Sequence, residues 1–338
     1  MIIVMDNGAT DEQIGTVVSK IQSFGLYANV SRGTERTVIG AIGDERRLDP
    51  EMFNSLGGVE YSMHIVKQYK IVSREWHKHD SVIDVGGVQI GGSQVQVIGG
   101  PCSVETQDQM DTAARHVSGA GCKLMRGGAF KPRTSPYTFQ GNGEEGLKMF
   151  REAADKYDLR IVTELMDARM LDTFLRYDVD VIQIGTRSMQ NFELLKEVGH
   201  INKPVILKRG MSATISEWLM AAEYIAAGGN HNIIFCERGI RTFETAYRNV
   251  MDVTCIPVLK KETHLPVIVD PSHAGGKTWM VPALARAAIA AGADGLLVEM
   301  HPNPPEAWCD ADQALNPAEF EALMGSLKGI AQVIGRSL

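Results

Sequence analysis

Residues 124–141 gather cationic and hydroxyl side chains directly after an apolar run. They include Arg126, Lys131, Arg133, Thr134 and Ser135. The apolar residues 122–125 predict a strand that ends here, and two prolines stiffen the loop that follows because proline fixes φ. Arginine can bind a phosphate through two N–H donors, whereas lysine acts as a point charge. A solvated basic loop is the alternative. Glycines at a strand end combined with prolines favour instead a rigid site for a phosphorylated ligand.

More cationic side chains follow other apolar runs along the chain: Arg187, Lys208 and Arg238. Like charges repel by several kcal/mol per close pair in partly buried surroundings, so such a set needs anions between its members. We therefore expect these side chains, together with those of residues 124–141, to converge on two phosphorylated groups and a carboxylate.

A second group of side chains has metal-ligand character: Cys102, His273, Glu299 and Asp310. One sulfur, one imidazole and two carboxylates suit a divalent transition metal such as Mn²⁺, Fe²⁺, Co²⁺ or Zn²⁺ better than Mg²⁺ or Ca²⁺. Cys309, next to Asp310, is an alternative ligand, or a thiol able to bridge Cys102 under oxidation. The remaining cysteines and histidines are interpreted as packing or hydrogen-bonding residues.

The elements that must position these residues alternate between strand and helix from residue 94 onward. Apolar strands are predicted over 95–98, 122–125, 161–164, 181–184, 205–207, 233–236, 267–269 and 296–299. Helical patterns lie between most of them, for example over 146–157, 168–177, 215–227 and 281–291. Eight such strands predict an α/β fold with a (β/α)₈ barrel, and an open doubly wound sheet is the alternative. In a barrel the active site lies at the carboxyl ends of the strands, where the predicted metal ligands follow the neighbouring first, seventh and eighth strands.

Residues 1–67 predict a separate small domain of βαββαβ order, which is the ferredoxin-like arrangement. Its strands are predicted over 1–5, 26–30, 37–42 and 59–66, its first helix is capped by Asp11, and a short helix covers 50–56. The domain resembles ACT-like modules, which bind small amino acids between subunits, although a structural appendage is the competing interpretation. Residues 68–92 form a connection with a predicted hairpin, 81–85 and 88–90 around Gly86-Gly87, that covers the base of the barrel domain, 93–338.

Composition narrows the class of protein. The net charge of −7 argues against nucleic acid or an anionic membrane as partner. No apolar run approaches the roughly 20 residues that span a bilayer, and the first residues do not read as a signal peptide. Five scattered cysteines suit a reducing compartment, so we expect a cytoplasmic protein. A domain of about 65 residues is marginal alone, which favours docking or oligomerisation.

Six segments together resemble the 3-deoxy-D-arabino-heptulosonate 7-phosphate synthases that carry an N-terminal ACT-like domain. They are GGPCSVE (99–105), KPRTSPYTFQG (131–141), IQIGTRSMQN (182–191), LKRG (207–210), ERGIRTFE (237–244) and DPSHAGG (270–276). The resemblance covers nearly the whole chain. The sister synthases of 3-deoxy-D-manno-octulosonate 8-phosphate share the barrel but have an Asn-Arg-Ser type of loop where this chain has KPRTS, and they are the nearest alternative.

The resemblance implies that phosphoenolpyruvate condenses with erythrose 4-phosphate and that phosphate is released, at the entry to aromatic amino acid synthesis. It assigns Arg187 and Arg238 to the phosphate of phosphoenolpyruvate, and Arg126 with Lys208 to its carboxylate side. Thr186 also belongs to the substrate site, and Lys131 is a proton donor near the enol. The resemblance assigns Arg133, Thr134 and Ser135 to the phosphate of the aldose. The metal, held by Cys102, His273, Glu299 and Asp310, acts as a Lewis acid on the aldehyde, and Glu164 is the candidate that positions or deprotonates the attacking water.

The same resemblance implies a homotetramer. We further expect tyrosine or phenylalanine to bind between ACT-like domains as a feedback inhibitor. Among other enzymes, a Schiff-base aldolase could use Lys131 or Lys208, whose pKa the neighbouring arginines are expected to depress. A metal-dependent amidohydrolase is disfavoured because no His-x-His follows the first barrel strand. A ligand-sensing module that has lost catalysis is the alternative from another class.

Overall fold

The computed structural model describes residues 1–33, 36–44, 48–64 and 68–338. The chain divides into two compact units, Met1–Lys78 and His79–Leu338, and each is described by itself. Among the described residues, none of the helices combines the length and the apolar character needed to cross a membrane.

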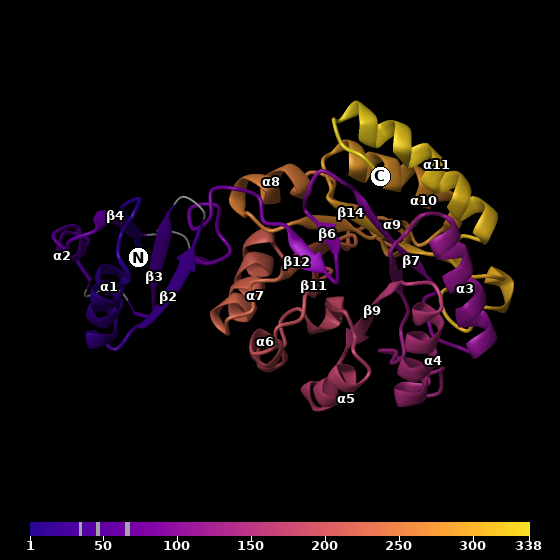
Figure 1. The fold of residues 1–338 in the computed structure, drawn as a ribbon. Coiled ribbons are helices and arrows are strands. Elements are labelled where there is room, and N and C mark those ends of the chain that lie inside the picture. The colour runs from indigo at the N-terminus through magenta and orange to yellow at the C-terminus, as the bar shows by residue number, and fades with distance from the viewer. Residues whose placement is uncertain (34–35, 45–47, 65–67) are drawn as a thin grey trace. The chain divides into compact units, whose positions relative to one another are not determined.

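The first unit is a four-stranded antiparallel sheet with one long helix and one short helix (Figure 1). Its elements are β1 Ile2–Met5, α1 Asp11–Ser23, β2 Tyr27–Arg32, β3 Thr37–Ile42, α2 Glu51–Asn54 and β4 Val59–Met63. The strand order is β2-β3-β1-β4, which confirms the predicted ferredoxin-like arrangement. Helix α1 buries Ile14, Val17 and Ile21, which repeat every three or four residues and belong to one core cluster with Met1, Ile3 and Phe53.

Two predicted details of this unit differ. The cap of α1 is Thr10 rather than Asp11: the Thr10 hydroxyl accepts from the backbone N–H of Gln13, whose side chain accepts from the Thr10 N–H in return. Asp11 is the first helical residue, where its charge still favours the helix N-terminus. Helix α2 is shorter than the predicted 50–56. The end of the strand predicted over 59–66 falls on residues 65 and 66, which lie outside the described residues.

The second unit is a closed barrel of parallel strands surrounded by helices (Figure 1), as predicted. Its strands are β7 Gln96–Gly100, β8 Leu124–Arg126, β9 Arg160–Leu165, β10 Val181–Ile184, β11 Val205–Lys208, β12 Ile233–Glu237, β13 Val267–Val269 and β14 Gly295–Glu299. The α-helices are α3 Gln107–Gly119, α4 Gly143–Asp155, α5 Leu171–Arg176, α6 Phe192–Gly199, α7 Ile215–Ala227, α8 Cys255–Glu262, α9 Pro271–Gly275, α10 Val281–Ala290 and α11 Pro317–Val333. Strands β14 and β7 pair, and this pairing closes the ring.

Element ends differ from the predictions where backbone bonds decide them. Strand β8 begins at Leu124 rather than at Cys122, because the Cys122 N–H bonds the Val117 carbonyl and still belongs to the turn that ends α3. Strand β7 continues through Gly99 and Gly100, where a Cβ on Gly100 would lie 2.1 Å from the Arg126 carbonyl oxygen. Only glycine permits this close approach of β7 and β8.

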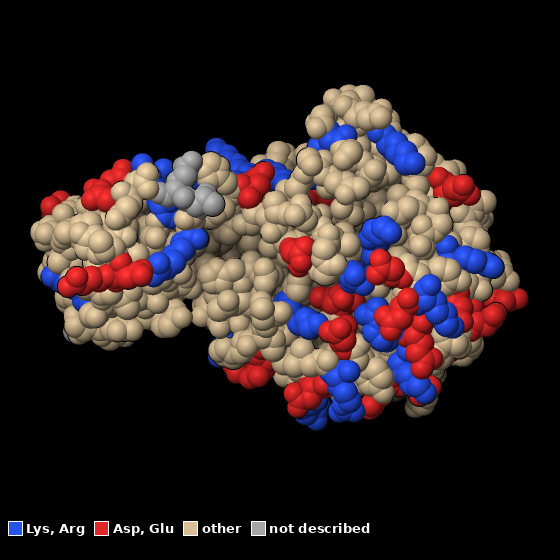
Figure 2. All heavy atoms as spheres, viewed as in Figure 1, with Lys and Arg blue, Asp and Glu red and all other residues tan. Residues whose placement is uncertain are grey.

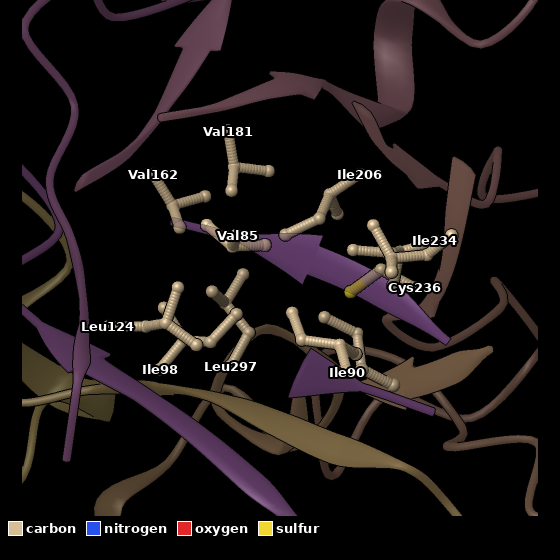
Figure 3. Packing of buried hydrophobic residues seen from close by; sticks show 12 residues of the cluster. Val85, Ile90, Ile98, Leu124, Val162, Val181, Ile206, Ile234, Cys236 and Leu297 are labelled. Atoms are coloured by element: carbon tan, nitrogen blue, oxygen red, sulfur yellow. The ribbon is translucent and has the colours of Figure 1, made fainter. Parts of the chain in front are cut away.

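A hairpin of β5 Ile83–Val85 and β6 Val88–Ile90 lies at the amino ends of the barrel strands. Gly86 and Gly87 form its turn with φ of 57° and 92°, the left-handed region that glycine adopts without strain. Figure 3 shows Val85 and Ile90 among barrel residues such as Leu124, Val162 and Ile206. The hairpin therefore fills one end of the barrel with apolar side chains, and the polar cavity lies at the other.

The outer surface of the barrel unit carries paired charges. Figure 2 shows acidic and basic side chains intermixed over the face seen there. Examples are the ion pairs Lys156–Asp111 at 2.6 Å and Arg176–Glu144 at 2.9 Å. Such exposed pairs contribute about 0–1 kcal/mol each to stability.

Candidate active site and metal site

The carboxyl ends of the barrel strands surround a cavity of about 390 Å³. Its charged lining residues are Lys131, Arg133, Arg187, Lys208, Arg238, Arg248, His273, Glu164 and Asp310. Among these described side chains, six lysines and arginines face two carboxylates, so the cavity is strongly electropositive although the chain is acidic overall. An electropositive cavity of this size suits a small molecule that carries several negative charges.

The four predicted metal ligands lie together at one side of this cavity. One donor atom each of Cys102, His273, Glu299 and Asp310 lies within 4.8 Å of all the others. The Cys102 Sγ is 3.3 Å from Asp310 Oδ2, and the His273 Nε2 is 3.4 Å from Glu299 Oε1 and 4.0 Å from Asp310 Oδ2.

Different elements hold the four donors. Cys102 follows β7, and Glu299 ends β14 with its N–H bonded to Ser272 Oγ at 3.0 Å. His273 lies on α9, whose cap Asp270 accepts the His273 N–H through Oδ1 and has Oδ2 2.7 Å from the ring Nδ1. This contact leaves Nε2 facing the other donors. Histidines that bind a metal commonly have such a carboxylate partner at their second ring nitrogen, which fixes the orientation of the ring. Asp310 has φ 50°, in the left-handed region that aspartate tolerates better than most residues.

The protonation of the cluster fits a divalent metal. Burial lowers the pKa of His273, so its imidazole is neutral and able to ligate. Burial raises the pKa of Glu299 and Asp310, but interactions with His273, and with Arg126 for Glu299 and Arg248 for Asp310, outweigh it and hold both pKa values below their usual range. A hydrogen bond with Cys309, burial and the Glu299 charge raise the pKa of the Cys102 thiol. A bound cation supplies the opposite effect, because metal binding releases the thiol proton. This donor set suits a transition metal.

Several predicted substrate residues are already paired within the protein. Arg126 is buried behind the cavity with Nη1 2.6 Å from Glu299 Oε1, and Lys208 forms an ion pair with Asp270. The expectation that anionic ligands alone separate the cations was therefore wrong in part. Carboxylates at the ends of β13 and β14 neutralise these two cations, and residue types alone do not reveal which carboxylate lies within reach of a cation.

Lys131 lies against the metal cluster. Its Nζ is 2.9 Å from the Cys102 carbonyl oxygen and 3.0 Å from the Cys102 Sγ. Burial lowers the pKa of Lys131, but the interaction of its ammonium group with the Cys102 sulfur outweighs burial and Arg126, so the pKa is raised. The expected depression of this lysine pKa was wrong, and a raised pKa disfavours Lys131 as a Schiff-base nucleophile.

The loop after β8 presents its polar groups to the cavity. Arg133, Thr134 and Ser135 all line it, and so does Thr186 at the end of β10. The Arg133 guanidinium is fixed by Nη1 at 2.6 Å from Cys309 Sγ and by Nε at 3.2 Å from Thr138 Oγ1. Across the cavity, Arg187 Nη1 donates to the Pro132 carbonyl at 2.9 Å and so ties β10 to this loop.

Arg238 is a buried cation whose hydrogen-bond donors are not all satisfied. It is 4% exposed and lines the cavity, and its Nε and Nη1 have no hydrogen-bond partner among the described residues. Burial lowers its pKa, because the charged form has lost water. Buried guanidinium donors left unpaired cost free energy, so this position suits an anionic ligand.

Glu164 lies on β9, opposite Gln183 of β10, and lines the cavity. Its Oε2 accepts from Gln183 Nε2 at 3.3 Å. A Cβ at position 185 would lie only 1.8 Å from Glu164 Oε1, so any residue other than glycine there would clash with this carboxylate. Gly185 therefore provides the space for this carboxylate.

Three side chains of the site escaped the sequence analysis as site residues. Arg248 lines the cavity and donates to Gln313 Oε1 at 2.8 Å, and Gln313 donates to Glu299 Oε2 at 2.7 Å. Asp270 holds both His273 and Lys208. Asp270 directly follows β13 and could have been found there, whereas nothing in the spacing of Arg248 and Gln313 distinguishes them from surface residues.

Comparison with known proteins adds the family. Residues 70–334 match the DAHP synthetase I family, and residues 1–67 match the DAHP synthase ferredoxin-like domain. A phospho-2-dehydro-3-deoxyheptonate aldolase of Thermotoga maritima is 50% identical over 99% of both chains. A 2-dehydro-3-deoxyphosphooctonate aldolase of Koribacter versatilis is 30% identical, over 74% of this chain and 96% of its own.

Solved structures agree with these sequence matches. The crystal structure of the Thermotoga maritima phospho-2-dehydro-3-deoxyheptonate aldolase (DAHP synthase) superposes with a TM-score of 0.79 at 49% identity, covering 99% of this chain and 98% of that one. A truncated form of the 3-deoxy-D-arabino-heptulosonate 7-phosphate synthase of the same organism gives a TM-score of 0.75 at 48% identity over 80% of this chain and 98% of its own. The resemblance found in the sequence motifs is thereby confirmed: the chain belongs to the DAHP synthetase I family of transferases and carries its ferredoxin-like domain at the N-terminus.

Proposed function

We propose that this protein condenses phosphoenolpyruvate with erythrose 4-phosphate to give 3-deoxy-D-arabino-heptulosonate 7-phosphate and inorganic phosphate. The observation that carries the proposal is the buried Arg238, whose Nε and Nη1 have no hydrogen-bond partner in the described part of the chain, in an electropositive cavity beside the Cys102–Asp310 donor cluster. The identity of 50% with the Thermotoga maritima enzyme supports the same assignment.

The proposed roles follow from position. Arg238 and Arg187 bind the phosphate of phosphoenolpyruvate, and Lys208 binds its carboxylate side, with Arg126 acting from behind Glu299. Arg133, Thr134 and Ser135 bind the phosphate of the aldose on the opposite loop, and Thr186 completes the cavity wall between them. Holding two anions side by side removes the entropic cost of bringing them together.

The chemical steps then use few groups. C3 of the enol attacks the aldehyde carbon, and Lys131 Nζ holds the proton that the new hydroxyl receives. Cys102, His273, Glu299 and Asp310 would hold a divalent ion, which supplies Lewis acidity to the aldehyde oxygen when bound. Glu164 orients the water that adds to C2, after which cleavage of the C–O bond releases phosphate.

The acceptor sugar tests this proposal. Phosphate release is measured with phosphoenolpyruvate and either erythrose 4-phosphate or the five-carbon arabinose 5-phosphate. The octulosonate 8-phosphate synthase is the second candidate, since its relatives are 30% identical, and a preference for the five-carbon sugar would establish it instead. Borohydride trapping with substrate is the control for the Schiff-base aldolase. A covalent adduct would contradict the metal route.

Regulation and assembly belong to the same proposal. We expect tyrosine or phenylalanine to bind between ferredoxin-like domains in a homotetramer, where exposed apolar residues such as Tyr27 would be covered. Deleting residues 1–67 should abolish inhibition by these amino acids and keep activity, because residues 1–78 form a compact unit of their own. Inhibition that persists in the truncated chain would contradict this. The free thiols of the five cysteines, all in the described part of the chain, support a cytoplasmic location.

A further inference from the structure

One buried carboxylate outside the proposed ligand set joins the segments that carry two of the ligands. Glu105 is 6% exposed and follows β7. Its Oε1 accepts from Ser103 Oγ at 2.8 Å and from the Trp308 backbone N–H at 2.9 Å, and its Oε2 lies 3.3 Å from His301 Nε2. The inference drawn from this contact rests on the metal site of the proposed function.

These bonds connect the neighbourhoods of Cys102 and Asp310. Ser103 is the residue after Cys102, and Trp308 comes two residues before Asp310. His273 and Glu299 are fixed by α9 and by the end of β14, whereas Asp310 lies in an irregular segment and has a left-handed φ of 50°. Side-chain bonds, among them those of Glu105 and the direct contact of Cys102 Sγ with Asp310 Oδ2 at 3.3 Å, therefore connect Cys102 to the segment that carries Asp310.

The partners of Glu105 also fix its orientation and charge. The Asn303 N–H donates to His301 Nδ1 at 3.0 Å, which leaves the ring proton on Nε2, facing Glu105. Burial raises the pKa of Glu105, but the bonds from His301, Trp308 and Ser103 outweigh it and hold the pKa below its usual range. A charged acceptor forms stronger hydrogen bonds than a neutral one.

The backbone of the same segment holds a third loop. Asn142 Nδ2 donates to the Glu105 carbonyl at 2.7 Å and to the Val104 carbonyl at 3.0 Å. Asn142 ends the loop that contains Lys131 and Arg133. The residues around Glu105 thus join the loops after β7, β8 and β14.

We propose that Glu105 is a positioning residue, which through Trp308 and His301 sets the distance between Cys102 and Asp310 and thereby the metal affinity of the site. A carboxylate that fixes the backbone on both sides of a ligand set reduces the reorganisation needed on binding. Replacing such outer partners typically lowers metal affinity by about tenfold to a hundredfold.

The test is a Co²⁺ titration of the full-length, chelator-treated protein, followed by the thiolate-to-cobalt absorption and by a competing chelator. Glu105→Gln keeps the volume but places an amide N–H₂ against either His301 Nε2 or the donors on the other side. We expect it to weaken Co²⁺ binding by about tenfold to a hundredfold and to change the thiolate band. His301→Leu removes one of the same bonds from its other side and should act in the same direction, so the inference stays testable if one variant does not fold.

Asp294→Asn is the matched control. Asp294 is also a buried carboxylate that accepts a backbone N–H, from Val267 at 2.7 Å, but it precedes β14 at the amino end of the barrel. We expect this variant to unfold at a lower temperature while its Co²⁺ affinity stays that of the parent. A purely structural role for Glu105 predicts the same behaviour for Glu105→Gln.

The outcomes separate the two proposals. If the parent binds Co²⁺ with a thiolate band and folded Glu105→Gln binds it equally tightly with the same band, the positioning role is wrong and the metal site stands. If the parent and Cys102→Ser bind Co²⁺ alike, with no thiolate band, the metal site itself is wrong and the positioning role fails with it.

Discussion

A substitution of Gly185 by alanine tests the role of Glu164 with little disturbance elsewhere. Gly185 has φ −71° and ψ 161°, an extended conformation that alanine adopts readily. The nearest atoms to an added Cβ all belong to the Glu164 carboxyl group, at 1.8, 2.6 and 3.3 Å. The substitution therefore acts on the far end of one side chain rather than on the backbone.

The size of the effect follows from this geometry. To restore ordinary contact, Glu164 Oε1 must move from 1.8 Å to at least 3.4 Å from the new Cβ, a displacement of about 1.6 Å. A catalytic group misplaced by about 1 Å can cost about a hundredfold in rate. We therefore expect kcat for phosphate release to fall about a hundredfold. The free energy of unfolding should stay unchanged or rise by less than about 1 kcal/mol, because alanine restricts the unfolded chain.

The assay measures kcat and both KM values by phosphate release, with urea unfolding alongside. Glu164→Gln should lose a similar factor, and the double variant should lose little more, because both changes act on the same carboxylate. Gly325→Ala in α11 is the control: no described atom lies within 4 Å of its Cβ, apart from the backbone of its own helix. A Gly185→Ala protein with the parent kcat would refute the role given to Glu164.

Three further predictions address the anion site, the metal and pH. Arg238→Leu should raise KM for phosphoenolpyruvate by about a hundredfold, as expected for the loss of a buried charged contact. It should not lower the urea midpoint of the ligand-free protein, because Nε and Nη1 have no partner among the described residues. A lower midpoint with unchanged KM would contradict the phosphate assignment. Chelation should abolish activity in the parent, and re-addition of Mn²⁺, Fe²⁺, Co²⁺ or Zn²⁺ singly should restore it, whereas full activity after chelation would contradict the metal route. Burial lowers the pKa of His231, so the unfolded chain binds more protons than the folded chain below about pH 6.5. The free energy of unfolding therefore decreases as the pH is lowered through this value. His231→Gln should make the pH dependence of the unfolding free energy shallower on the acid side of that value, and an unchanged slope would contradict this reading.

The fold could be predicted because its strands are short, continuous apolar runs. Strands buried on both faces read as nearly continuous apolar runs, so β13, which is all Val and Ile, begins and ends where the run was predicted. The errors lie at element ends, where single hydrogen bonds decide. Thr10 rather than Asp11 caps α1, since its hydroxyl has the geometry to accept from Gln13, and sequence alone cannot distinguish two adjacent cap residues.

The site was predictable to the extent that it lies at strand ends. Cys102, His273 and Glu299 follow neighbouring strands, so barrel topology alone brings them together. Arg248 and Gln313 reach the site through irregular segments, whose paths no periodicity reveals. The ion pair of Arg126 with Glu299 was missed for a related reason: residue types show what can bind a phosphate, but the partner that satisfies a cation in the folded chain depends on distances.

The ion pair of Arg126 with Glu299 also belongs to a chain of hydrogen bonds that connects a proposed metal ligand to the cavity wall. Glu299 Oε1 accepts from Arg126 and Oε2 from Gln313, which in turn accepts from Arg248 at the cavity wall. A carboxylate oxygen has a second lone pair, so Glu299 can ligate an ion while it keeps both donors. A cation held there would weaken the attraction of Glu299 for Arg126 and would raise the positive potential of the cavity. Because such coupling is reciprocal, a metal that tightens binding of phosphoenolpyruvate must itself be bound more tightly once phosphoenolpyruvate is present.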